Sequence, residues 1–151
     1  MRSAILVDIA NTYISLQRAY GKRLNYDKLM SNFSNVIFAY AYGTIVNDSS
    51  IKFFDALRHL GYELKTVRAN KNVDFNVSIA IDVIKISERI DQVIICSSNS
   101  QLAPLLEWLN DKGIKITILG CHIPSILRNL STNFIEITEE YLENEADKAT
   151  K

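Results

Sequence analysis

Residues 93–109, VIICSSNSQLAPLLEWL, decide the fold, because they join an apolar strand, a polar turn and an amphipathic helix. The uninterrupted apolar run 93–96 is typical of a strand that helices cover on both faces of a parallel sheet. The turn 97–101 then leaves the carboxyl end of a central strand, where open α/β sheets bind their ligands. A second interpretation stays open, because a serine or asparagine of this turn would also serve as the N-cap of the following helix.

Strand and helix patterns alternate along the rest of the chain. Apolar, β-branched runs predict strands at residues 3–9, 36–42, 62–67, 114–119 and 134–137. Helical spacing of apolar residues predicts helices at residues 12–20, 26–33, 51–60, 73–86 and 125–129. This alternation indicates a three-layer α/β/α sandwich with a mainly parallel central sheet. We expect one domain at residues 1–138 and a frayed, charged tail at residues 139–151.

The composition limits the classes of function. The 17 basic and 17 acidic residues cancel, so no global positive field attracts nucleic acid. Cys96 and Cys121 end predicted strands without metal-ligand spacing around them, which favours buried thiols in a reducing compartment. The first residues enter a predicted strand and show no apolar signal core before a cleavage site. No apolar run approaches the roughly 20 residues that cross a bilayer. We therefore expect a soluble, cytoplasmic protein that does not enter the membrane.

Two polar residues mark the end of the first predicted strand. Asp8 interrupts the apolar run SAILVDI, and Asn11 lies in the turn after it. A buried carboxylate requires a partner. Asp8 and Asn11 therefore either cap the next helix or belong to a metal site at the carboxyl end of the strand.

The predicted helix 73–86 carries an acidic stripe. Asp74, Ser78 and Asp82 recur every fourth residue, so they share one face of a largely buried helix. Carboxylates on such a face need a cation, an arginine or water. Alternatively, Asp74 stabilises the helix N-terminus through the helix dipole and Asp82 forms a local hydrogen bond.

The connection 68–72, which precedes this helix, is basic and polar. Its Arg68 and Lys71 either contact a phosphate backbone or belong to an ordinary exposed loop.

The candidate residues are expected to meet at one edge of the sheet. Right-handed crossovers bring the carboxyl ends of parallel strands to the same edge, which gathers Asp8, Asn11, Asp74 and the turn 97–101 there. Oxygen ligands of this kind suit Mg²⁺ or Mn²⁺. Such an ion can activate a water and stabilise the leaving oxygen of a phosphodiester. A phosphatase-like or nucleotide-binding domain is disfavoured, because the sequence has no glycine-rich phosphate loop.

Four segments resemble the successive motifs of the NYN domain family: VDIAN at 7–11, NVDFNVSIAID at 72–82, SSNSQLAPLLEWLNDKGIKITILG at 97–120, and LRNLSTNFIEI at 127–137. Each motif is weak alone, but their order and spacing are specific. The family belongs to the PIN-like metal-dependent ribonucleases, and its LabA-like branch is the most similar. The resemblance implies a PIN-like sandwich that cleaves RNA with Mg²⁺ or Mn²⁺.

The resemblance also implies roles for single residues. Asp8 and Asp74 match metal-binding carboxylates, Asn11 matches the companion of Asp8, and Asp82 matches a further acidic position. The third family motif reads Ser-Gly-Asp-Ser-Asp-Phe, whereas this chain has Ser97-Ser98-Asn99-Ser100-Gln101-Leu102. Neutral amides thus replace both aspartates. An amide still offers an oxygen, but it carries no charge and cannot act as a general base.

Two functions therefore stay open. The first is a divergent metal-dependent endoribonuclease of full or reduced activity. In it Asp8 and Asp74 hold the ion, Asn99 orients the ion or the water, Asn11, Ser97, Ser98, Gln101 and Asp82 support the site, and Arg68 and Lys71 contact RNA. The second is a catalytically inactive PIN-like module that binds RNA or a protein partner. A third explanation is that Asn99 was introduced on purpose to inactivate the enzyme, but this would leave Gln101 unexplained.

The helix around Trp108 could support a homodimer through its exposed apolar residues, unless Trp108 belongs to the core.

Overall fold

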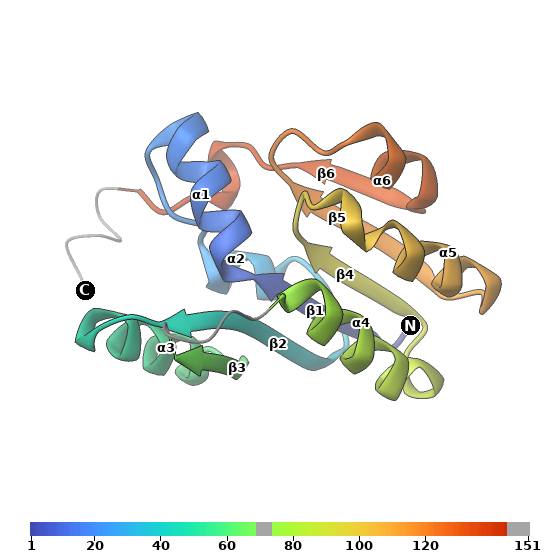
Figure 1. The fold of residues 1–151 in the computed structure, drawn as a ribbon, viewed down its shortest axis with the longest axis horizontal. Coiled ribbons are helices and arrows are strands. Elements are labelled where there is room, and N and C mark those ends of the chain that lie inside the picture. Colours follow the sequence, from blue (N-terminus) through green and yellow to red (C-terminus); the bar gives the residue numbers. More distant parts are fainter. Residues whose placement is uncertain (69–73, 145–151) are drawn as a thin grey trace.

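The computed structural model describes residues 1–68 and 74–144, where strands and helices alternate as the sequence predicts (Figure 1). The strands are Ser3–Asp8 (β1), Val36–Ile45 (β2), Glu63–Arg68 (β3), Gln92–Cys96 (β4), Lys115–Gly120 (β5) and Asn133–Glu136 (β6). The α-helices are Ile9–Tyr20 (α1), Tyr26–Ser31 (α2), Asp48–His59 (α3), Phe75–Ile86 (α4), Ala103–Asp111 (α5) and Ser125–Leu130 (α6). Short 3₁₀ turns lie at Ser87–Arg89, Ser100–Leu102 and Glu139–Tyr141.

The six strands form one parallel sheet in the order β3-β2-β1-β4-β5-β6. The chain runs outward from β1 to β3, returns to the other side of β1 as β4, and then runs outward to β6. The topological switch point therefore lies between β1 and β4, and ligands of such sheets bind at the carboxyl ends of these strands. Val7 pairs with Cys96, so Asp8 and Ser97 leave neighbouring strands at the same level.

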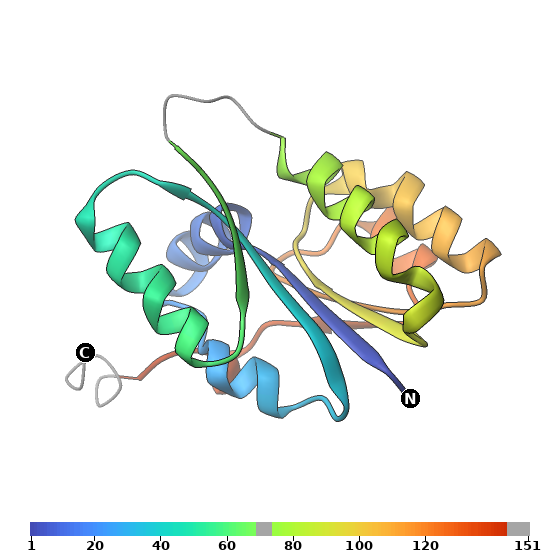
Figure 2. The same ribbon diagram turned by 90° about the horizontal axis from the view of Figure 1, so that it is seen from below.

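Helices cover both faces of the sheet, as Figure 2 shows from below. Alternate residues of β1 point to opposite layers, because successive side chains of a strand face opposite sides. Ala4 and Leu6 pack with α4, α5 and α6. Ile5 and Val7 pack with α1, α2 and α3. All four side chains are fully buried, so the predicted three-layer α/β/α sandwich is confirmed.

The helix α4 is less buried than the sequence predicts. Ile79 and Val83 are fully buried against the sheet, whereas Val77, Ile81 and Ile84 are 56%, 48% and 46% exposed. The expectation of a largely buried helix was wrong, because only one stripe of a helix lying on a sheet can contact it. The apolar residues of the opposite side therefore lie at the surface.

The two cysteines are free and buried, as predicted. Burial raises the pKa of Cys96 to about 12, so this thiol stays protonated. Trp108 is partly buried and packs against the core beneath α4, α5 and α6. Lys112 lies over its ring, with 5.4 Å between the ammonium nitrogen and the ring centroid. No helix in the described ranges combines the length and the apolarity needed to cross a membrane.

The chain continues to pack on the domain after β6. Tyr141 and Leu142 are buried, and Leu142 forms an antiparallel bridge with Leu24. Lys22 forms an ion pair with Glu139 at 3.2 Å. The charged tail expected from residue 139 thus begins with residues that are fixed against the domain, and its last part, residues 145–151, lies outside the described residues.

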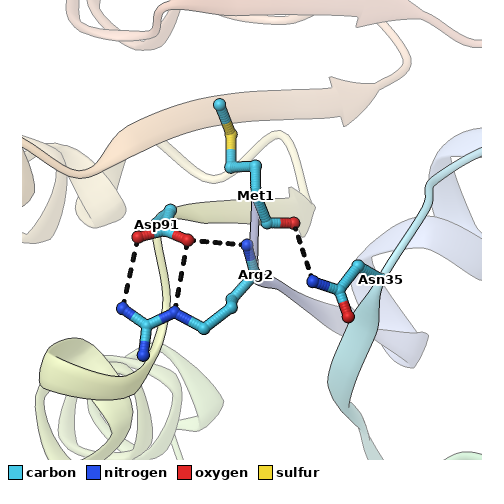
Figure 3. A network of polar contacts seen from close by, with 4 residues as sticks. All are labelled: Met1, Arg2, Asn35 and Asp91. Carbon is cyan, nitrogen blue, oxygen red and sulfur yellow. Dashed lines mark hydrogen bonds and ion pairs between the residues drawn. The ribbon is translucent and has the colours of Figure 1, made fainter.

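A polar network closes the opposite, amino edge of the sheet (Figure 3). The guanidinium of Arg2 donates to both carboxylate oxygens of Asp91, at 3.3 and 3.2 Å, and its backbone N–H donates to Asp91 at 2.7 Å. Asn35 donates to the carbonyl oxygen of Met1 at 3.4 Å. These bonds tie the start of β1 to the segments that precede β4 and β2.

Candidate functional site

Asp8 lies at the switch point, where it ends β1 and caps α1. Its Oδ1 accepts a hydrogen bond from the backbone N–H of Asn11 at 3.1 Å, and the residue is only 7% exposed. Burial raises the pKa of this carboxyl group, backbone N–H groups of Asn11 and Ala10 lower it, and the charge of Asp74 raises it again. The charge of Asp74 is the smallest of these four influences on the pKa of Asp8.

The turn after β4 is bonded to the end of β1. The backbone N–H of Ser98 donates to Oδ1 of Asn11 at 3.0 Å. Within the turn, the N–H of Asn99 donates to Oγ of Ser97 at 3.2 Å, and the N–H of Gln101 donates to Oδ1 of Asn99 at 2.9 Å. Asn99 thus caps the 3₁₀ turn at Ser100–Leu102, which leads into α5. Asn99 therefore both caps this turn and lies at the carboxyl ends of the strands, so the two interpretations of the turn are compatible.

The start of α4 joins the same turn. Asp74 caps α4 and accepts a hydrogen bond from the N–H of Asn76 at 2.9 Å. The side-chain amide of Asn76 donates to Oε1 of Gln101 at 3.2 Å. The amide oxygen of Asn76 is buried without a hydrogen-bond partner among the described residues. Sequence reasoning missed Asn76, although its position in the first turn, two residues after Asp74, could have indicated it.

These contacts form one hydrogen-bonded series that leads from Asp8 to Asp74, which we call the switch-point cluster. It contains Asp8, Asn11, Asp74, Asn76, Ser97, Ser98, Asn99 and Gln101. All of these except Asn76 are candidates from the sequence. The elements that carry them are separated by up to about 90 residues of chain, and the sheet brings them to one edge.

Two other candidates among the described residues, Asp82 and Arg68, do not join the switch-point cluster. Asp82 accepts a hydrogen bond from the hydroxyl of Tyr42 at 2.7 Å, and it lies eight residues, or about 12 Å, along α4 from Asp74. Burial and Asp82 raise the pKa of Tyr42, which keeps the phenol protonated as a donor. Arg68 is exposed as the last residue of β3. Lys71 lies outside the described residues.

A close approach of β5 supports the turn of the switch-point cluster. The hydroxyl of Ser98 donates to the carbonyl of Cys121 at 2.8 Å. A side chain at Gly120 would place its Cβ only 2.5 Å from Oγ of Ser98 and 3.3 Å from the carbonyl oxygen of Ser97. Because neither atom lies at the end of a long flexible side chain, only glycine fits here without moving the turn.

The donor set decides which metal ion the cluster can hold. Across residues 1–68 and 74–144, no group of three or more His, Cys, Asp or Glu side chains could hold a metal. Asp8 and Asp74 have no ion pair with a basic side chain of these ranges. Two neighbouring carboxylates with neutral oxygens around them fit a hard divalent cation that keeps several waters. They do not fit a site in which protein side chains supply every ligand.

The fold and the site define a class, a doubly wound parallel α/β domain with an acidic pair at its switch point. The chain belongs to the NYN domain family, whose match covers residues 2–139. This match confirms the family that the motifs indicate, whereas the LabA-like branch stays a prediction. The comparison with curated proteins gives no match.

Several solved structures are similar to this chain, including the following three. A protein of unknown function from Vibrio parahaemolyticus, VPA0982, is 26% identical with a TM-score of 0.88, over 94% of this chain and 96% of that one. A bacteriophage T5 5'-exonuclease with bound zinc is 15% identical with a TM-score of 0.46, over 69% and 52% of the two chains. The T5 flap endonuclease in complex with DNA and metal ions is 14% identical with a TM-score of 0.49, over 79% and 55%. The Vibrio protein therefore shares the fold over nearly the whole chain.

Proposed function

We propose that this NYN domain is a divergent metal-dependent ribonuclease, in which Asp8 and Asp74 hold Mg²⁺ or Mn²⁺. The observation that carries the proposal is the hydrogen-bonded series that links Asp8 to Asp74 through the turn after β4, and the charge of Asp74 also acts on Asp8. A cation relieves the repulsion between two such neighbouring charges. The nuclease-type fold of the family supports the same reaction class.

The residues of the switch-point cluster have different roles in this proposal. The N-cap bonds of Asp8 and Asp74 fix the positions of both carboxylates. Asn99 offers a neutral oxygen near the ion, and Asn11 holds the turn that carries Asn99. When bound, the divalent ion supplies an activated water and stabilises the leaving oxygen of the phosphodiester. Arg68 and Lys71 remain candidates for contacts with the RNA backbone.

The second candidate function is a catalytically inactive module that binds RNA. Asn99 and Gln101 favour it, because neutral amides occupy the positions at which the family motif has aspartates. Each missing carboxylate weakens the affinity for a cation. The two functions differ in one measurable property, since only the first requires cleavage that depends on a divalent metal.

The test is a cleavage assay with labelled single-stranded and hairpin RNA, in Mn²⁺, in Mg²⁺ and in EDTA. We expect cleavage only with a divalent ion, and Asp8→Asn should lower the rate on the order of 100-fold or more, as loss of a group that stabilises transition-state charge does. Asn is as good an N-cap as Asp, so the fold should persist. The matched control is Asp111→Asn, which removes an exposed carboxylate at the end of α5.

Two results would oppose the proposal. Cleavage that survives in EDTA, or that Asp8→Asn does not reduce, would remove Asp8 and the metal from the reaction. Absence of cleavage with retained RNA binding would favour the inactive module. In that case the binding constant should fall with rising salt concentration, because phosphate contacts release counterions.

A further inference from the structure

A pocket of about 270 Å³ opens between α1 and α3. One wall is formed by Ile9, Thr12 and Tyr13 of α1, the helix that begins directly after Asp8, and the other wall by the start of α3 with Phe53. Arg23, from the loop between α1 and α2, closes it. The volume is just below the roughly 300–1,000 Å³ of typical small-molecule sites, which suits one nucleotide rather than a larger ligand.

The pocket combines an apolar floor with an exposed aromatic ring. Ile9, Leu24 and Tyr26 line the floor and are buried. Tyr13 is 53% exposed, and in the part of the chain that the structure describes no other ring stacks on it. Exposed aromatic rings next to a nucleic-acid backbone provide stacking surfaces for bases. Tyr13 is thus available for a base that enters the pocket.

Arg23 supplies a positive charge at the same pocket. Its guanidinium carbon lies 5.5 Å from the centroid of the Phe53 ring, and Phe53 is in turn packed edge-on against Tyr26. A guanidinium that lies over a ring keeps its N–H groups directed outward for a phosphate. Within the described ranges Arg23 has no ion pair with an acidic side chain, and no acidic residue lines this pocket.

The start of α3 lies at the rim of the pocket. Oδ1 of Asn47 accepts the N–H of Ser50 at 3.1 Å, and Asn47, Ser49 and Ser50 all face the pocket. The positive end of this 12-residue helix favours an anion. Asp48 in the first turn offsets part of that effect, so Arg23 is the main positive group.

We propose that this pocket is a nucleotide subsite for single-stranded RNA, in which Tyr13 stacks on the base and Arg23 meets the adjoining phosphate. The proposal rests on the proposed function, because it places the RNA relative to Asp8. It also specifies the substrate class. A base can reach Tyr13 only when it is unstacked, which single strands and loops allow and a continuous duplex does not.

The test is fluorescence anisotropy with the full chain in EDTA and labelled 12-nucleotide oligo(A), oligo(U) and a blunt RNA duplex. Wild type should bind oligo(A) more tightly than oligo(U), and both more tightly than the duplex. Tyr13→Ala should weaken oligo(A) binding by roughly five- to 100-fold, the range for loss of one base–aromatic stack. Tyr13→Phe should retain it. Arg23→Ala should lower the slope of log K against log salt by about 0.7, the value for one phosphate contact on a single strand.

The chain contains a matched control at the outermost strand β6, on the far side of the sheet from α3. Arg128 lies over the ring of Phe134 with 5.9 Å between the guanidinium carbon and the ring centroid, and Phe134 is 48% exposed. Arg128→Ala and Phe134→Ala also remove a guanidinium and an aromatic ring, but on α6 and β6. Both should bind oligo(A) like wild type. Tyr13 and Arg23 are exposed, so thermal melting should show intact folding in their variants.

The outcomes separate this inference from the proposed function. If RNA is cleaved with Mn²⁺ but Tyr13→Ala and Arg23→Ala bind like wild type, the subsite is overturned alone. If binding needs Tyr13 and Arg23 but no metal-dependent cleavage occurs, the nuclease proposal fails and the subsite stands. An equal loss of oligo(A) affinity in Arg128→Ala and Arg23→Ala would also overturn the subsite, and so would equal affinities for duplex and single-stranded RNA.

Discussion

The switch-point edge has two halves that fold alike but differ in charge. Asp8 and Asp74 cap α1 and α4, and Asn99 caps the turn before α5, with hydrogen bonds of 3.1, 2.9 and 2.9 Å. Asn and Asp are about equally good N-caps. Helix capping therefore does not determine which of these positions carries a carboxylate. The charged half and the neutral half differ in what they can bind.

The comparison predicts an asymmetric metal site. The half formed by Asp8 and Asp74 offers negative charge, whereas the half formed by Asn99 and Gln101 offers only neutral oxygens. Cation affinity rises with the number of charged ligands, so the ion should be held from one side and exchange readily. Substitutions that change the charge of an N-cap residue but keep the cap distinguish effects on metal affinity from effects on fold stability.

A marked effect on metal binding is expected when the neutral half receives a charge. Asn99→Asp keeps the cap and should tighten Mn²⁺ binding on the order of tenfold, because a charge at about 4 Å from an ion contributes substantially even at a protein dielectric near 20. Titration calorimetry measures the affinity. Asn32→Asp, which adds the same charge at the exposed end of α2, should leave it unchanged. Unaltered affinity in Asn99→Asp would show that residue 99 does not face the ion.

The next effect concerns the packing that holds the neutral half. Gly120→Ala should lower the free energy of unfolding by about 1–3 kcal/mol, the usual range for overpacking, because its Cβ meets Oγ of Ser98. Chemical denaturation measures the loss. The double variant Gly120→Ala with Ser98→Ala removes the obstructing hydroxyl and should recover part of the stability. Wild-type stability in Gly120→Ala would mean that the turn yields without cost.

A smaller effect separates cap from charge at Asp74. Asp74→Ala removes the N-cap of α4 and should lower the free energy of unfolding by about 1 kcal/mol, whereas Asp74→Asn should lower it by a few tenths at most. Both variants should weaken Mn²⁺ binding. Denaturation and calorimetry on the same pair of variants measure the two quantities. Equal destabilisation by Ala and Asn would assign the stability to the carboxylate charge.

The smallest effect is expected at the amino edge, where the charges are paired and exposed. Bonds from Arg2 hold the pKa of Asp91 below its usual value. A depressed folded-state pKa stabilises the fold above the unfolded pKa of about 3.9, and this contribution is lost as pH falls through the folded value. Arg2→Ala should therefore lower the melting temperature slightly at pH 7, and the difference should vanish near about pH 2. A constant difference between these pH values would contradict the ion-pair origin.

Much of the fold is readable from the sequence, because uninterrupted apolar runs such as 93–96 occur in strands buried on both faces. The position of Asp8 follows from the same pattern, since a carboxylate within an apolar run must meet a partner at the strand end. Asn11, Asp74 and the turn 97–101 were also placed at the correct edge, because parallel strands share one.

Other features depend on register and packing that periodicity does not specify. Helical spacing put Asp74 and Asp82 on one face, but two turns of α4 separate them and Asp82 bonds to Tyr42. The contact between Asn76 and Gln101 joins two helix starts 25 residues apart. Arg23 and Phe53 come from different elements. None of these pairs has a local sequence signal.

Anomalous scattering from crystals soaked in millimolar Mn²⁺ tests most directly whether Asp8 and Asp74 share one divalent ion. We expect a single anomalous peak at the switch point, between the two carboxylates, that is absent from crystals of Asp8→Asn. A switch point without a peak, or a peak that persists in Asp8→Asn, would contradict the shared-ion site.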